Sequence, residues 1–151
     1  MGNPVGVLAA CVGKGLFAGA IGTAAMTASN TIEMKITGRG PSTTPALAVC
    51  KVLGIELQEE QQKLTFGNVI HWLYGTSWGG VRGLIDFGGL KGLPAMATFL
   101  AAVWGSELVM LPGMGVTKPA WTWSASEVGT DALHHVVYAA ATSLAFSWLD
   151  S

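Results

Sequence analysis

The sequence predicts an all-α fold: a bundle of four transmembrane helices, built from two weakly repeated helical hairpins, with a short extra helix in the first connection. Three observations lead to it. Only 11% of the 151 residues are Asp, Glu, Lys or Arg, less than half of the roughly 25% typical of soluble domains. The mean hydropathy is +0.48, and the few charges are grouped between long uncharged stretches. We therefore expect one integral membrane domain over residues 1–151.

Four stretches have the length and the apolar character of a membrane-crossing helix, which needs about 20 residues. They cover approximately residues 13–34, 66–85, 93–111 and 132–149. The third is the cleanest, since Glu107 is the only charged residue between Pro94 and Pro112. Because lipid offers no hydrogen-bond partner to a peptide group, helices that pair their own backbone are the expected form of all four stretches.

The connection after the first stretch is the longest, and it contains the signals of one more helix. Residues 38–41, Gly-Arg-Gly-Pro, are typical of a helix end, and Thr44 followed by Pro45 is typical of a helix start. These signals predict a short helix over residues 45–53 that ends at Gly54.

Glycines recur at four-residue intervals on the first two stretches. Gly15 and Gly19 form one GxxxG motif, and Gly75, Gly79 and Gly83 form a double one. In lipid such motifs allow two helix backbones to approach closely. They predict packing between helices of this chain, and the alternative is a docking surface for a second copy or a partner protein.

A short pattern repeats between the second and fourth stretches. His71 aligns with His135, and Tyr74 aligns with Tyr138. We interpret the match as two copies of a helical hairpin that enter the membrane from the same side.

Each stretch carries a polar or ionisable side chain at a similar distance from the end that faces the two longer connections. These polar-layer residues are Asn30, Glu33, His71, Glu107, His134 and His135. A carboxylate inside the bilayer costs a few kcal/mol unless it is paired, protonated or hydrated. We therefore expect Glu107 to face inward and to share a hydrogen bond or a proton with His71 or with a histidine of residues 132–149. Adjacent helix positions point about 100° apart, so at most one of His134 and His135 is expected in any one site.

Three interpretations of this polar layer stay open. It is a satisfied network that fixes the helices relative to one another, or a proton or ion relay, because histidine titrates near neutral pH. The third is a haem or metal site, with His71, His135 and Glu107 as weak candidates. No motif in the sequence predicts a cofactor or a catalytic residue.

The charge distribution bears on partners and orientation. A formal net charge of −1 provides no broad basic surface, which argues against a nucleic-acid partner. Five Lys or Arg residues lie near the longer connections and three near the other end, so the positive-inside rule places the longer connections in the cytoplasm and both termini outside it. The five are Lys35, Arg39, Lys51, Lys63 and Lys118, and the three are Lys14, Arg82 and Lys91.

Three segments together resemble one family. They are Ile32-Glu33-Met34-Lys35, His71-x-x-Tyr74-Gly75-x-x-Trp78-Gly79 and Leu133-His134-His135-x-x-Tyr138. The chain resembles, over most of its length, the YagU-like group of small bacterial multi-pass inner-membrane proteins. The resemblance implies a location in the bacterial inner (cytoplasmic) membrane. That group has no settled activity, so the resemblance transfers no catalytic residue and no cofactor.

The predicted function is that of a non-enzymatic accessory or structural subunit in the lipid bilayer. It would pack against a larger membrane complex or against itself, with the glycine motifs as docking surfaces, because four short helices enclose little interior. One alternative is a proton- or ion-conducting protein that uses Glu107, His71 and His135. A second alternative is a haem- or metal-binding membrane anchor.

Overall fold

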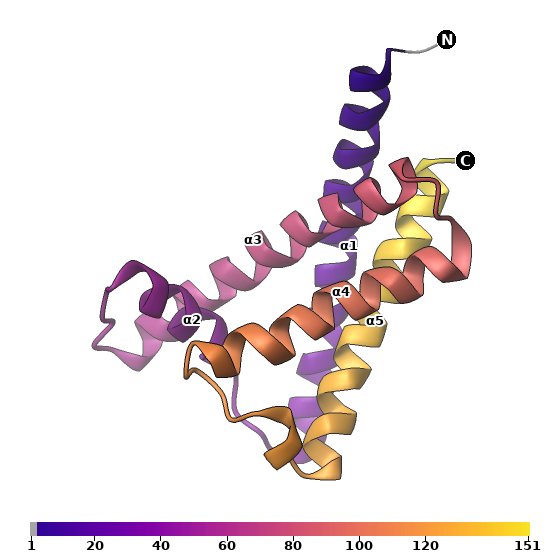
Figure 1. Ribbon diagram of the computed structural model, residues 1–151. Coiled ribbons are helices and arrows are strands. Elements are labelled where there is room, and N and C mark those ends of the chain that lie inside the picture. The colour runs from indigo at the N-terminus through magenta and orange to yellow at the C-terminus, as the bar shows by residue number, and fades with distance from the viewer. Residues whose placement is uncertain (1–2) are drawn as a thin grey trace.

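The computed structural model describes residues 3–151, and they fold into helices joined by short connections (Figure 1). The helices are α1 (Pro4–Thr37), α2 (Thr44–Leu53), α3 (Glu60–Phe87), α4 (Gly92–Gly113) and α5 (Ala125–Leu149), with one 3-10 turn, η1 (Ala120–Thr122). No strand occurs within residues 3–151. The all-α class predicted from the sequence is confirmed.

Helix caps explain why α1 and α5 begin earlier than the apolar stretches. The Asn3 side chain accepts a hydrogen bond from the Val5 amide, 3.1 Å away, so α1 begins at Pro4 instead of residue 13. At the start of α5, Ser124 and Glu127 form a reciprocal capping box. Hydropathy marks the lipid-compatible part of a helix, whereas hydrogen bonds to the first free amides decide where the helix begins.

Two helices, α1 and α4, are long and apolar enough to cross a membrane, as judged over residues 3–151. The sequence predicted four such helices. The helices α3 and α5 have sufficient length, 28 and 25 residues, but polar side chains interrupt them. Arg82 and Asp86 interrupt α3, and the pair His134 and His135 interrupts α5.

The predicted packing glycines lie where α1 crosses α3. A Cβ atom on Gly79 would overlap the carbonyl oxygen of Gly15 and would stand 2.6 Å from the Cα of Gly19. A Cβ on Gly83 would likewise overlap the backbone of Cys11, and one on Gly75 would overlap the Thr23 side chain. The glycine surfaces are therefore occupied within the chain and are not open as docking surfaces.

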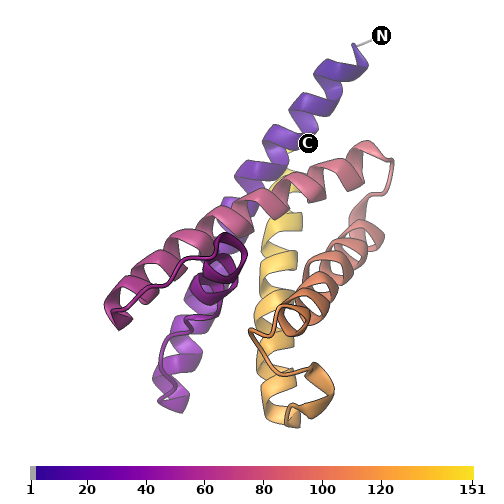
Figure 2. The ribbon, with the colours of Figure 1, turned by 60° about the vertical axis from the view of Figure 1, so that its left-hand side comes forward.

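The long helices are not parallel. In the views of Figure 1 and Figure 2, α3 and α4 run obliquely across α1 and α5, while the chain termini and the α3–α4 turn lie at one end of the molecule. The connections that contain α2 and η1 lie at the other end. A core of Phe99, Val103, Tyr138 and Ala139 joins α4 to α5. The oblique crossing brings all the α-helices around one cavity.

Candidate functional site

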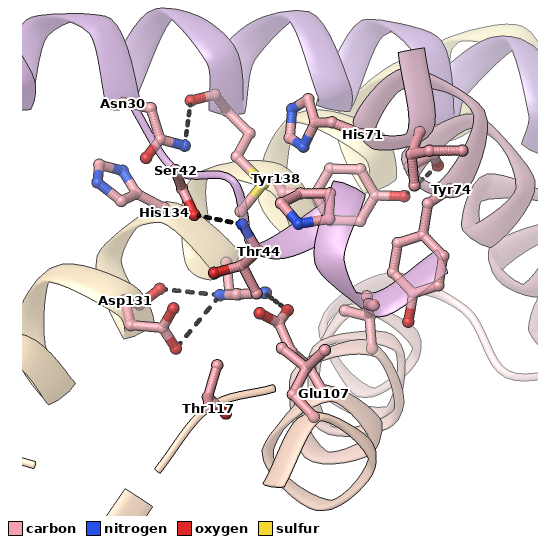
Figure 3. Close-up of a pocket in the computed structure, with 18 of the residues that line it drawn as sticks. Asn30, Ser42, Thr44, His71, Tyr74, Glu107, Thr117, Asp131, His134 and Tyr138 are labelled. Atoms are coloured by element: carbon pink, nitrogen blue, oxygen red, sulfur yellow. Dashed lines mark hydrogen bonds and ion pairs between the residues drawn. The ribbon is translucent and has the colours of Figure 1, made fainter. Parts of the chain in front are cut away.

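A cavity of about 750 Å³ lies between the helices and is lined by residues from α1, α2, α3, α4 and α5 (Figure 3). Its volume falls within the roughly 300–1,000 Å³ of typical small-molecule sites. All six residues of the predicted polar layer line it: Asn30, Glu33, His71, Glu107, His134 and His135. Most of the other wall residues are apolar, among them Met26, Val49, Ile70, Val103 and Met110.

Glu107 and His135 form a short polar contact in the cavity wall. Glu107 Oε2 lies 2.7 Å from His135 Nε2, and His135 Nδ1 lies 2.9 Å from the carbonyl oxygen of Asp131. Because a carbonyl oxygen only accepts, Nδ1 must donate. Nε2 then carries a proton only if the imidazole ring is charged. The hydrogen bond with Glu107 therefore needs one proton, which sits either on His135 Nε2 or on the Glu107 carboxyl group. The geometry makes Glu107 and His135 a proton-sharing pair.

The indole of Trp104 supports this pair from α4. Its Nε1 donates to Asp131 Oδ2 at 2.7 Å, and its ring stacks on His135 with the ring centroids 6.2 Å apart. The sequence analysis did not include Trp104 in the site, because an interior Trp is ordinarily only a packing residue.

His134 faces α1, whereas His135 faces Glu107 on α4. Its Nδ1 lies 2.8 Å from Ser29 Oγ, and its Nε2 lies 3.8 Å from Glu33 Oε2 and has no hydrogen-bond partner. The His134 side chain is only 5% exposed. Adjacent helix positions point in different directions, which is why His134 and His135 enter separate contacts.

Arg39 is a second residue that the sequence analysis did not assign to the site. Its guanidinium donates to Glu33 Oε2 from Nη2 at 2.6 Å and from Nε at 3.0 Å, and Nη2 reaches Asn30 Oδ1 at 3.4 Å. The backbone turns back because Gly38 has φ 75°, a left-handed conformation that suits glycine. This turn brings Arg39 over the last turns of α1.

His71 lies apart from these pairs. Its Nε2 is 3.2 Å from Thr27 Oγ1 on α1. Of the two partners that the sequence offered to Glu107, the structure therefore brings the α5 histidine into hydrogen-bond contact and joins His71 to Thr27.

The weak metal candidates His71, His135 and Glu107 are not gathered as ligands. Within residues 3–151, no group of three or more His, Cys, Asp or Glu side chains is placed to hold a metal ion. The physical reason is that both ring nitrogens of His135 are already engaged, while His71 contacts Thr27.

The charges at the opposite end of the molecule pair with one another. Arg82 is 1% exposed, lies over the Phe146 ring and stands 3.7 Å from Asp86. Asp150 accepts from Lys14 at 2.9 Å and from Lys91 at 3.4 Å. The hydrogen bond from Lys14 is the main reason that the pKa of Asp150 lies below its ordinary value.

The carboxylate of Glu127, which lines the cavity, caps the start of α5. Glu127 Oε2 accepts from the Ser124 amide at 2.7 Å, and this bond lowers the pKa of Glu127. The carboxylate is therefore held in its charged form at the start of α5, where negative charge also favours the helix dipole.

Comparison of the chain with protein-family models, curated proteins and solved structures finds no match.

Proposed function

We propose that this chain is a non-enzymatic integral membrane protein which binds a small molecule in the cavity between its helices. We further propose that α1, α3, α4 and α5 all cross the membrane. The observation that carries the proposal is the cavity itself, a space of about 750 Å³ whose exposed wall surface is mainly apolar and on which ionisable side chains converge. Small-molecule sites have this composition.

The distribution of polar side chains along α5 supports four crossings. His134 and His135 are buried, whereas Leu133 is 53% and Leu144 is 72% exposed. In α3, likewise, Arg82 is buried and Leu73 faces outward. Ionisable groups inside and large apolar groups outside are typical of helices surrounded by lipid. Arg82, His134 and His135, which lower the hydropathy of α3 and α5, are thus shielded from lipid.

Helix length is compatible with this arrangement. Even α4, with 22 residues, is about 33 Å long, and the hydrocarbon layer is about 30 Å thick. A location in the bacterial inner membrane, and membership of the YagU-like group, are part of the proposal and are supported by the residues quoted above.

The experiment that tests binding uses a small neutral probe, 3-trifluoromethyl-3-phenyldiazirine, on the purified protein in dodecyl maltoside. After illumination, we expect saturable labelling of peptides that line the cavity. Ala48→Trp should remove this labelling because Ala48 lines the cavity from α2. The neighbouring substitution Leu47→Trp is the matched control, since Leu47 is exposed and lies outside the cavity lining. Labelling that is non-saturable, or equal in both variants, would refute the proposal.

A role as an accessory or structural subunit is compatible with such a site and stays a proposal. Purification under native conditions tests it, because a stable larger complex or a homo-oligomer would be visible by mass. The glycine motifs are closed between α1 and α3, so we expect any partner to contact the outer apolar faces, such as the one that carries Leu144.

Proton conduction is a second candidate because Glu107 and His135 share a proton in the cavity wall. A conducting protein should give pH-driven flux in liposomes, and Glu107→Gln should abolish the flux. Retained flux in that variant would exclude this pair as the relay.

A further inference from the structure

We infer that the cavity binds an organic cation with an apolar body, an inference that rests on the proposed small-molecule function. The first argument is the charge of the walls. Four carboxylates line the cavity: Glu33, Glu107, Glu127 and Asp131. Arg39 is the one Lys or Arg residue in the lining.

Pairing inside the walls neutralises only part of this negative charge. The charge of the Arg39 guanidinium is paired with Glu33 through two contacts of 2.6 and 3.0 Å. Glu107 and His135 share one proton across 2.7 Å, so this pair has no net charge. Glu127 is compensated at the start of α5, where it accepts from the Ser124 amide and Lys118 acts on it. Asp131 then faces the cavity with a hydrogen bond from the Trp104 indole but with no Lys or Arg partner. In a low-dielectric cavity, an uncompensated carboxylate favours a cation.

The second argument is an unsatisfied atom in the wall. His134 Nε2 has no hydrogen-bond partner, although only 5% of the side-chain surface is exposed. Buried polar atoms without a partner are uncommon in native proteins. When Nδ1 carries the His134 proton, the lone pair of Nε2 is free and lies 3.8 Å from Glu33 Oε2. This unpartnered lone pair therefore favours a positively charged ligand.

The aromatic and apolar lining residues indicate the chemistry of the rest of the ligand. Tyr74, Tyr138 and Trp123 provide aromatic rings, and aromatic faces attract cations, more strongly where water is absent. The apolar side chains of Met26, Val103 and Met110 match a hydrocarbon or aromatic body. An anionic amphiphile would meet like charges in the same space, and a neutral one would leave the Asp131 carboxylate uncompensated.

The test uses two probes of the same shape and opposite charge, tetraphenylphosphonium and tetraphenylborate, as competitors of diazirine labelling. The measured quantity is the ratio of their half-maximal concentrations. Comparing this ratio between proteins cancels the different partition of the two ions into micelles. We expect Ser126→Lys, which adds a positive charge to the cavity rim, to shift the ratio by about tenfold against the cation, or about 1.4 kcal/mol.

Ser126→Gln is the matched control, since it has a similar size and no charge, and its ratio should equal that of the wild type. Asp131→Asn should shift the ratio in the same direction as Ser126→Lys. An unchanged ratio in Ser126→Lys would overturn the assignment to cations, whereas the absence of saturable diazirine labelling would refute the binding cavity itself. The two failures are thus distinguishable in one set of samples.

Discussion

Glu107 on α4 and His135 on α5 stand 2.7 Å apart and share one proton in the wall of the cavity. His135 is almost completely enclosed, whereas Glu107 is about one quarter exposed, at 28% of its side chain. The contact ties α4 to α5 at the level where the polar residues meet. Its removal therefore affects both stability and the shape of the cavity.

We predict that Glu107→Ala is more destabilising than Glu107→Gln. The alanine variant leaves His135 Nε2 without a partner, at a cost of about 1–3 kcal/mol, whereas the glutamine amide can donate to that nitrogen. Unfolding in mixed micelles with increasing dodecyl sulfate measures the difference. Glu56→Ala, in the exposed α2–α3 connection, is the control and should be neutral. Equal stability of the Ala and Gln variants would show that the hydrogen bond contributes nothing.

Gly79→Ala should separate α1 from α3. The new methyl group would overlap the Gly15 backbone, and backbone atoms cannot move aside as a flexible side chain can, so we expect a loss of about 1–3 kcal/mol or more. Gly105→Ala on α4 is the matched control, because nothing lies within 4 Å of its Cβ position. There the better helix propensity of alanine should stabilise the protein by up to about 1 kcal/mol. Two variants of equal stability would contradict the close crossing.

The sequence was sufficient for the all-α class and for placing Glu107 and His135 at one level. Helix rise fixes how far each residue lies from a helix end, which is why Glu107 and His135 could be placed at one level without a structure. Pairing depends instead on how helices cross, and local spacing does not contain that information. Arg39 reaches Glu33 only because Gly38 reverses the chain, and Trp104 reaches Asp131 only because α4 runs obliquely over α5.

The buried ion pair of Arg82 and Asp86 should show strong coupling. Asp86→Ala leaves the Arg82 charge in an enclosed site, where loss of one partner costs about 3–5 kcal/mol. Arg82→Met should cost less, because Lys91 still lies 3.6 Å from Asp86. We expect the double variant to be more stable than Asp86→Ala alone. Additive effects in this double-mutant cycle would argue against a direct interaction.

The ion pairs of Asp150, at the C-terminal end of α5, predict a pH dependence of the stability. Lys14 and Lys91 lower the pKa of Asp150, and Asp86 and Arg82 lie in the same cluster. A lowered carboxyl pKa contributes stability above the ordinary value of about 3.8, and this is lost as the pH falls through the native value.

Asp150→Asn should therefore be less stable than the wild type at neutral pH, by up to about 1 kcal/mol since the pairs are partly exposed. This difference should disappear in acid. Measuring both proteins at each pH removes the contribution of other titrating groups. A difference that grows as the pH falls would contradict the sign of the Asp150 shift.

Membrane topology gives the most direct test of four crossings, and three single cysteines are enough. Cys11 and Cys50 are free and buried, so both are first replaced by alanine, and Glu56→Cys, Lys118→Cys or Ser151→Cys is added. If all four long helices cross, Glu56 and Lys118 lie on the same side, and Ser151 lies on the opposite side. A membrane-impermeant maleimide should label the first two in inverted vesicles and the third in spheroplasts, because the positive-inside rule places the longer connections in the cytoplasm. If only α1 and α4 crossed, the Glu56 and Lys118 positions would be labelled from opposite sides. That outcome would leave the polar groups of α3 and α5 outside the hydrocarbon and would remove the reason for their pairing.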